Sequence, residues 1–263
     1  MSTAVLIPFF RYQPHYRDYY RIYFEQLLKG LEIWGDEFDK LYLIDQDMEF
    51  TTEDFNRLLA VKPNSEIIKS VNQGHHWVQF KDAIPHIKED RILFLDNDVI
   101  IWKKGIVKKW LENEVALTFD GSGGLKAQMQ EKFPILKKYD ATRMGSYYFV
   151  LPKKVFEKIP DFDFAPITYE EGTYLKELGY TTQKGDWSDS FGLFTMKLLS
   201  LYPEVGFIED DRSSISFPDN KTSNPRQLGY YHVRNGNLPI YTINSFYTHP
   251  EDYTRTLKIT PIS

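Results

Sequence analysis

Apolar runs that end in carboxylates mark the first hundred residues of the chain. The segment RILFLDNDVIIW, Arg91 to Trp102, carries Asp96 and Asp98 between two apolar stretches. An apolar run of this length predicts a buried strand. Because unpaired charge is costly inside a protein, we expect a positive group close to these carboxylates: a metal ion, a substrate cation, a basic side chain or a helix N-terminus.

Similar patterns predict strands that alternate with helices in this part of the chain. The expected strands are Thr3–Phe10, Lys40–Asp47, Ser65–Val71 and the apolar start of the Arg91 segment. The expected helices run from Tyr16 to about Gly30, from an N-cap at Thr51 or Thr52 to Val61, and over His76–Ile87. This alternation indicates an α/β fold with a mostly parallel central sheet flanked by helices.

The order is less regular after Trp102. We expect a strand and a glycine loop at EVALTFDGSGG, a strand, turn and helix at GSYYFVLPKKVFEKI, and a helix at SDSFGLFTMKLLSLY. The tail from Phe217 to Ser263 is rich in Asn, Pro and Tyr. Because no repeat, low-complexity tract or linker interrupts the chain, we expect one domain over residues 1–263.

Composition narrows the kind of protein. The 42% hydrophobic and 26% charged residues are typical of a chain with a packed core, not of a disordered one. The sequence has no apolar run of the ~18 residues that a membrane-spanning helix needs, no signal-peptide pattern and no cysteine. These features favour a cytoplasmic protein. The formal net charge of -5 argues against broad nucleic-acid binding.

Four aspartates are expected along one edge of the sheet. Ligands of open α/β sheets bind beyond the carboxyl ends of the strands, and Asp45, Asp47, Asp96 and Asp98 all fall at such ends. Mg²⁺ and Mn²⁺ prefer oxygen ligands, and Mg²⁺ is typically held by one or two carboxylates plus substrate phosphates. The pair Asp96 and Asp98 therefore predicts a divalent-metal site, of the kind that a diphosphate leaving group needs because charge builds up on it as the bond breaks.

The segment LFLDNDVII resembles the Asp-x-Asp motif of the GT-A class of nucleotide-sugar glycosyltransferases. The resemblance covers the layout of about residues 3–240 and implies a single GT-A (Rossmann-like) domain. It implies a nucleotide-binding half at about 1–102, an acceptor-binding half at about 103–240 and a C-terminal tail at 241–263. The implied enzyme is a hexosyl- or pentosyltransferase that moves a sugar from a nucleoside diphosphate sugar to a hydroxyl acceptor. Its cofactor would be Mn²⁺ or Mg²⁺, and a carboxylate base would make it inverting.

The resemblance also assigns roles to individual residues. Asp98 would bridge the metal to the diphosphate, Asp96 would hold the ribose or a metal-bound water, and His232 in YYHVRNG would join the metal. The later motif GDWSDSFG would supply the base that deprotonates the acceptor, with Asp189 preferred to Asp186. The other donor-binding residues that the resemblance implies are Pro8, Phe9, Arg11, Asp45, Asp47, Lys81, Gly145 and Arg234.

Other functions remain open on the sequence alone. An aspartyl-nucleophile, Mg²⁺-dependent phosphohydrolase also uses an Asp-x-Asp and a later Gly-Asp motif, but its nucleophile usually lies on the first strand. A glycosyltransferase acting on a modified phage DNA base is disfavoured by the net charge, so a glycan is the favoured acceptor. A non-catalytic nucleotide-sugar-binding protein would bind without turnover. Asp189 also suits a helix cap, and His232 a structural histidine. The sequence carries no signal for the oligomeric state.

Overall fold

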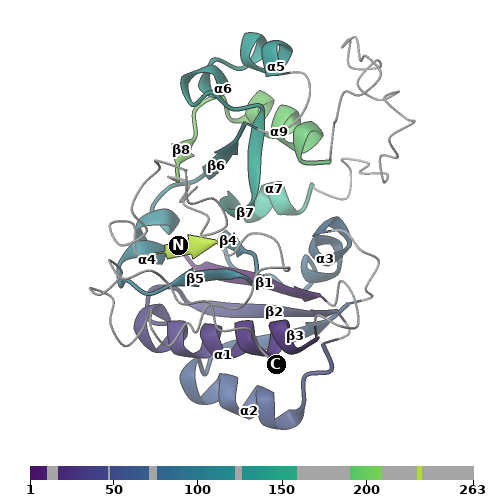
Figure 1. The fold of residues 1–263 in the computed structure, drawn as a ribbon, viewed down its shortest axis with the longest axis vertical. Coiled ribbons are helices and arrows are strands. Elements are labelled where there is room, and N and C mark those ends of the chain that lie inside the picture. Colours follow the sequence, from purple (N-terminus) through teal and green to yellow (C-terminus); the bar gives the residue numbers. More distant parts are fainter. Residues whose placement is uncertain are drawn as a thin grey trace.

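The computed structural model describes residues 1–10, 17–46, 48–70, 76–121, 126–158, 190–208 and 230–232. Over these residues the main sheet has seven strands in the order β3-β2-β1-β4-β7-β6-β8, and a small second sheet pairs β5 with β9 (Figure 1). The strands are β1 (Thr3–Phe10), β2 (Lys40–Gln46), β3 (Ser65–Lys69), β4 (Arg91–Leu95), β5 (Val99–Ile101), β6 (Ala116–Asp120), β7 (Arg143–Pro152), β8 (Gly206–Phe207) and β9 (Tyr230–His232). The described helices are α1 (Arg17–Trp34), α2 (Thr52–Val61), α3 (His76–Ala83), α4 (Ile106–Leu111), α5 (Lys126–Lys132), α6 (Pro134–Lys138), α7 (Lys153–Phe156) and α9 (Ser190–Leu201).

The sheet is mostly parallel, as the alternating pattern predicts. β1 pairs in parallel with both β2 and β4, β2 pairs in parallel with β3, and β6 with β8. Only β7 runs the other way, antiparallel to β4 and to β6. The predicted fold class, a mixed α/β layer structure with helices around a central sheet, is therefore confirmed. The sheet takes strands from both expected halves of the chain, and the single-domain assignment stays a prediction.

Alternate residues of the central strands feed two separate cores. Val5 and Ile7 point to the layer formed by α1, α2 and α4, whereas Ala4 and Leu6 point to the layer that contains α3, α7 and α9. Such two-sided burial requires the continuous apolar runs that the sequence shows, because both faces of a parallel sheet are covered by helices. In Figure 1, α1 and α2 lie with β1, β2 and β3 at one end of the molecule, and α5, α6 and α9 lie at the other.

Two helix ends differ from the sequence prediction. The first helix does not end near Gly30 but continues to Trp34, because Leu31 and Trp34 complete the apolar stripe that packs on the sheet. The third ends at Ala83, well before Ile87, because Pro85 disfavours helical backbone at the residue before it. The predicted cap at Thr51 is confirmed: its side chain accepts a hydrogen bond from the backbone N–H of Asp54.

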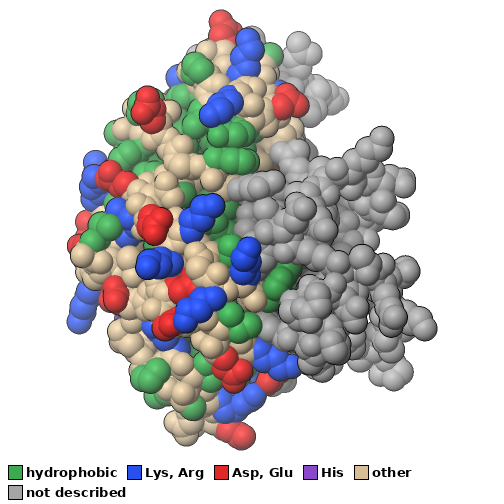
Figure 2. All heavy atoms as spheres, turned by 90° about the vertical axis from the view of Figure 1, so that its left-hand side faces the viewer, with side chains coloured by type: hydrophobic (Ala, Val, Ile, Leu, Met, Phe, Trp, Pro, Cys, Tyr) green, Lys and Arg blue, Asp and Glu red, His purple; other side chains and the backbone are tan. Residues whose placement is uncertain are grey.

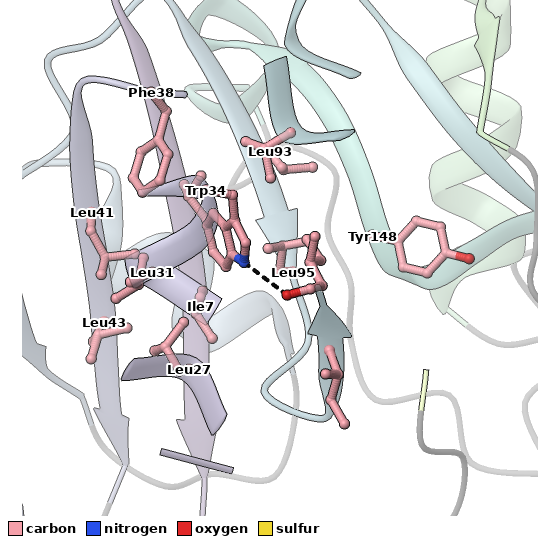
Figure 3. Close-up of a cluster of buried hydrophobic side chains, with 14 of the residues drawn as sticks. Ile7, Leu27, Leu31, Trp34, Phe38, Leu41, Leu43, Leu93, Leu95 and Tyr148 are labelled. Atoms are coloured by element: carbon pink, nitrogen blue, oxygen red, sulfur yellow. Dashed lines mark hydrogen bonds between the residues drawn. The ribbon is translucent and has the colours of Figure 1, made fainter. Parts of the chain in front are cut away.

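A hydrogen bond joins the end of α1 to β5. The indole Nε1–H of Trp34 donates to the carbonyl oxygen of Ile101 over 3.2 Å, inside a cluster of buried apolar side chains (Figure 3). Trp34 also packs against Phe38, with ring centroids 5.7 Å apart. This contact fixes the chain that follows β4 against the first helical layer.

No helix among the described residues combines the length and the apolar character needed to cross a lipid bilayer.

Candidate functional site

The carboxyl ends of four neighbouring strands meet at one edge of the main sheet. β3, β2, β1 and β4 are adjacent and parallel, so their last residues lie side by side. The chain order reverses between β1 and β4, because β2 and β3 lie on one side of β1 and β4 lies on the other. Ligands of open α/β sheets bind at such a switch point, beyond the carboxyl ends. This edge of the sheet is therefore the expected position of a ligand-binding site.

β1 and β4 stop pairing before β1 ends. The register between them finishes at Leu6 and Phe94, whereas β1 stays paired with β2 up to Phe10 and Gln46. Pro8 lies in this last part of β1 and has no backbone N–H with which to extend a ladder. β1 thus extends beyond its pairing with β4, at the edge where a ligand would enter.

The predicted metal motif forms a tight turn at this point. β4 ends at Leu95, and the backbone N–H of Val99 donates to the carbonyl oxygen of Asp96 over 3.1 Å. The N–H of Asp96 in turn donates to Tyr147 O of β7 over 2.8 Å, which ties the turn to the sheet. Asp96, Asn97 and Asp98 are half-buried. The turn therefore presents two carboxylates within three residues at the end of a central strand.

The side chains of this turn have oxygen atoms suited to a hard cation. The Oδ1 atoms of Asp96 and Asp98 are shielded from solvent and take no part in a hydrogen bond, although both residues have other interactions in the structure. Among the described residues no group of three His, Cys, Asp or Glu side chains is close enough to hold a metal ion. Two carboxylates with further ligands from a substrate phosphate is nevertheless a common arrangement for Mg²⁺.

The small second sheet brings His232 close to the turn. β5 begins directly after Asp98 and pairs antiparallel with β9, so that the Cα atom of Val99 lies opposite that of His232. The predicted ligands Asp98 and His232 are 134 positions apart in the printed sequence, yet their backbones are neighbours in this sheet. The side chain of His232 is outside what the structure describes, so its role as a metal ligand stays a prediction.

Asp45 is at the expected edge but its carboxylate is already engaged. Its side chain is 1% exposed. One oxygen, Oδ1, accepts from the backbone N–H of Met48 over 2.8 Å, and Oδ2 accepts from the Nζ of Lys69 at the end of β3. The first bond shapes the chain after β2, and the second is an ion pair between neighbouring strand ends. Sequence reasoning missed Lys69, although its position at the end of SEIIK matches that of Asp45 at the end of LYLID.

Two predicted donor-binding residues near the end of β1, Pro8 and Phe9, have buried side chains. Phe9 is fully buried, with its ring edge-on to Phe24 and Phe50 at centroid distances of 6.2 and 5.4 Å. Pro8 is also buried. The resemblance predicts that both residues help to hold the base of a nucleotide. The side chain of Phe9 belongs to the core on the α1 side, and the contact of both residues with a nucleotide stays a prediction.

Gly145 lies in an irregular part of β7 next to the turn. The register with β6 shifts between Leu117 and Phe119, which leaves extra residues of β7 beside Thr118. A Cβ atom on Gly145 would lie 2.4 Å from Thr118 Oγ1 and 2.8 Å from a ring carbon of Tyr147. Packing within the protein therefore already requires glycine here. Its predicted contact with a donor sugar stays a prediction.

Further polar groups gather at the same edge and were missed from the sequence. Ser70 donates to Asp82 over 2.6 Å and accepts from Gln46 over 3.2 Å, which links the ends of β2 and β3 to α3. Lys81, the predicted donor-binding residue, precedes Asp82 on α3 and is exposed. On the far side, Arg143 at the start of β7 donates to Asp120 at the end of β6 over 3.1 Å.

Five predicted site residues lie outside the residues that the structure describes. They are the nucleotide-binding candidates Arg11, Asp47 and Arg234 and the candidate bases Asp186 and Asp189.

Comparison with known proteins supports the fold. No protein-family model matches the sequence, and no curated protein is significantly similar to it. Among solved structures, the glycosyltransferase GlyE of Streptococcus pneumoniae TIGR4 is 15% identical, with a TM-score of 0.52 over 89% of this chain. This chain spans about half of that protein, 55% of its length.

Two further glycosyltransferase structures are more distant in shape. The galactosyltransferase LgtC, in complex with donor and acceptor sugar analogs, is 13% identical, with a TM-score of 0.49 over 99% of this chain and 97% of its own. Glucosyl-3-phosphoglycerate synthase of Mycobacterium tuberculosis is 13% identical, with a TM-score of 0.39 over 59% of this chain and 57% of its own. At such identities the likeness to GlyE shows the fold alone: the chain shares the α/β architecture of that protein.

Proposed function

We propose that the protein is a metal-dependent glycosyltransferase that moves a sugar from a nucleoside diphosphate sugar to a hydroxyl group of a glycan. One observation carries the proposal: the turn that bears Asp96 and Asp98 lies at the carboxyl end of β4, beside the point where the chain order of the sheet reverses. The likeness to the fold of GlyE supports the same conclusion at the level of architecture.

The residues of the turn fit Mn²⁺ or Mg²⁺. Carboxylate oxygens are the ligands that these cations prefer, and Asp96 and Asp98 present them from one turn that β7 holds in place. His232, opposite Val99 in β9, is the proposed third protein ligand. A bound divalent cation supplies a Lewis acid that offsets the charge growing on the diphosphate as it leaves.

Side chains and strand ends of the protein would bind the donor and take the proton of the acceptor. The strand ends of β1 and β2 would hold the nucleoside, with Arg11, Asp47, Lys81 and Arg234 as further candidate contacts. Asp189, or in its place Asp186, would take the proton of the acceptor hydroxyl as that oxygen attacks the anomeric carbon. A transition state resembling an oxocarbenium ion is expected, as in glycoside hydrolysis. Direct attack with such a base inverts the anomeric configuration.

A donor screen tests the proposal. Purified protein is incubated with common nucleotide sugars and Mn²⁺, and release of nucleoside diphosphate is measured with and without glycan acceptors. We expect release from one donor, stimulated by an acceptor and abolished by EDTA. Full activity in EDTA would contradict metal dependence, and binding of a donor without any turnover would favour a non-catalytic binding protein.

The same screen separates the rival enzymes. A phosphohydrolase would release phosphate from a generic phosphomonoester such as p-nitrophenyl phosphate and would need no nucleotide sugar. A DNA-modifying enzyme would transfer sugar to a duplex. Among the described side chains on the face drawn in Figure 2, basic and acidic groups are interspersed. Together with the net charge of -5, this favours a glycan over DNA as the acceptor.

The candidate base has its own test. Asp189→Asn keeps the size of the side chain but cannot take a proton usefully at neutral pH, so it should lower transfer by roughly 10²–10⁴-fold while leaving donor binding unchanged. Asp186→Asn, made in parallel, should leave transfer close to normal. Normal transfer by both variants would remove the carboxylate base, and the anomeric configuration of the product, read by NMR, would then decide between inversion and retention.

A further inference from the structure

The pair formed by Asp45 and Lys69 changes what the end of β2 can offer to a ligand. An unpaired carboxylate accepts hydrogen bonds from a base. In this structure Oδ1 of Asp45 already accepts from Met48 N–H, and Oδ2 accepts from Lys69 Nζ. The carboxylate is 1% exposed, whereas the lysine side chain is 69% exposed. The group that meets solvent at this point is therefore the ammonium, which is a donor only.

Strand register sets the direction of this group. Phe9, Asp45 and Lys69 are Cα partners across β1, β2 and β3, so they form one row along the carboxyl edge. Phe9 points into the core on the α1 side, and residues in register on adjacent strands share a face of the sheet. The ammonium of Lys69 therefore lies above the α1 and α2 layer, and one of its three hydrogens is used by Asp45.

The neighbouring polar groups at this edge are bonded to one another. Ser70 donates to Asp82 and accepts from Gln46, and these three residues belong to the α3 side of the sheet. At the ends of β2 and β3, Lys69 thus presents an exposed cationic donor on the α1 side of the sheet.

Distance and charge distinguish a base from a phosphate as the partner of Lys69. β3 lies three strand positions from β4, about 14 Å at the usual spacing, so the lysine is far from the turn of Asp96 and Asp98 where the diphosphate would bind. The buried carboxylate of Asp45 also offsets the positive charge of the lysine, which makes the pair a weak anion site. An ammonium donor whose charge is offset by a neighbouring carboxylate suits a neutral ring carbonyl.

We propose that Lys69, positioned by Asp45, recognises the base of the donor nucleotide and selects a base with a keto oxygen over the one with an amino group at the same ring position. The proposal rests on the proposed function. Uracil and guanine carry such an oxygen where cytosine and adenine carry an amino group, which would meet the ammonium donor to donor. The expected donors are therefore uridine or guanosine diphosphate sugars.

Calorimetric titration with four nucleotides tests this assignment. UDP, CDP, GDP and ADP are titrated in Mn²⁺ into the wild-type chain, Lys69→Met and Lys69→Arg. The wild type should bind UDP more tightly than CDP, and GDP more tightly than ADP. Lys69→Met should weaken the preferred nucleotide by roughly 10-fold to 100-fold and bring both ratios towards one, whereas Lys69→Arg should keep the preference.

Matched variants exclude an indirect effect. Lys104 forms a comparable ion pair with Asp36 before the amino end of β2, so Lys104→Met removes a lysine and its pair without touching the edge. This control should bind all four nucleotides as the wild type does. Lys69→Met leaves the buried carboxylate of Asp45 without its cation, which could itself weaken nucleotide binding. The double variant Asp45→Asn/Lys69→Met removes that charge as well, so it shows whether the unpaired charge or the missing donor causes the loss of affinity.

The outcomes separate the two proposals. Nucleotide binding with ratios that Lys69→Met does not change would overturn the role of Lys69 and leave the glycosyltransferase proposal intact. Equal wild-type affinities within both nucleotide pairs would overturn it as well. If the wild-type chain binds none of the four nucleotides in Mn²⁺, the proposed function itself fails, and the role of Lys69 falls with it.

Discussion

Single residues at the carboxyl edge differ in what holds them. Asp45 is buried, and its carboxylate accepts hydrogen bonds from Met48 and Lys69, so this side chain contributes to the stability of the fold. Asp98 is half-buried and lies on a turn of three polar residues. Substitution at Asp98 should therefore affect ligand binding more than stability.

The variant Asp98→Asn tests this directly. It keeps the shape of the side chain but removes the charge that a cation needs, so transfer should fall roughly 100-fold or more while the free energy of unfolding changes by about 0.5 kcal/mol or less. Transfer assays and urea unfolding measure the two effects. Asp90→Asn is the control, because Asp90 precedes the other end of β4 and binds Ser2 instead. Equal activity of both variants would contradict a metal role for Asp98.

Asp54 links two helices through its carboxylate. It accepts from Arg21 of α1 over 2.6 Å and from the backbone N–H and hydroxyl of Thr51 over 2.8 and 2.9 Å. Burial by itself raises the pKa of Asp54, but the hydrogen bonds from Arg21 and Thr51 outweigh it and hold the pKa below its ordinary value. The ionised carboxylate is thus favoured by folding.

The sign of the pH dependence follows from that lowered pKa. The stabilisation by Asp54 is fully present above the unfolded-state pKa, near 3.8, and is lost as the pH falls through the lower folded-state pKa. Asp54→Asn should therefore cost about 1 to 2 kcal/mol at pH 7, and the difference from wild type should shrink below about pH 4. Urea unfolding at a series of pH values measures it. A difference that is the same at pH 7 and pH 2.5 would contradict the assigned pKa direction.

At the scale of elements, β5 connects the candidate metal turn to the rest of the molecule. It pairs with β9 on one side, and its last residue, Ile101, accepts the indole hydrogen bond of Trp34 from α1 (Figure 3). The turn of Asp96 and Asp98 is thus held from both ends, by Tyr147 of β7 before it and by this contact after it.

Trp34→Phe should weaken the attachment of β5 to α1. The substitution keeps an aromatic ring in the core but removes the donor to Ile101, at a cost of about 1 to 3 kcal/mol in unfolding free energy. Because the turn loses one anchor, Mn²⁺-dependent nucleotide binding measured by calorimetry should weaken as well. Trp110→Phe is the control, since Trp110 is also buried and stacks on Tyr148 with centroids 5.2 Å apart. Its stability should fall without a matching loss of nucleotide affinity.

At the scale of the whole molecule, the proposed site joins parts of the chain that are far apart in sequence. The carboxyl ends of β1, β2, β3 and β4 form one side of the proposed site. β9 pairs with β5 in the small second sheet, which begins directly after the turn. A ligand that spans this edge would stabilise several elements at once.

Thermal unfolding with ligands tests that coupling. Mn²⁺ and the preferred nucleoside diphosphate together should raise the Tm by about 5 to 10 °C at 100 times Kd, and by more than the sum of their separate effects. The shift should disappear in EDTA and in the Asp98→Asn variant. A nucleotide shift of the same size in EDTA would show that nucleotide binding does not depend on a metal.

Much of the nucleotide-binding half could be predicted from the printed sequence. The four predicted runs in this half all contain strands, of which β4 is buried throughout, and Thr51 caps its helix as expected. These features depend on local chemistry: side-chain periodicity, capping and the exclusion of charge from the core. The same local rules place Asp45 and Asp98 near strand ends, because a charged side chain is costly in the middle of a buried strand.

Only the tertiary structure decided which of those ends meet and what their side chains bind. The pairing of Lys69 with Asp45 depends on the register of β3 against β2, and the approach of His232 to Asp98 depends on the pairing of β5 with β9. The position of Phe9 at the end of β1 suggests an aromatic side chain that faces a ligand, yet the ring is buried and packs edge-on against Phe50. Register and burial arise from packing between segments far apart in the chain, and local sequence patterns do not encode that packing.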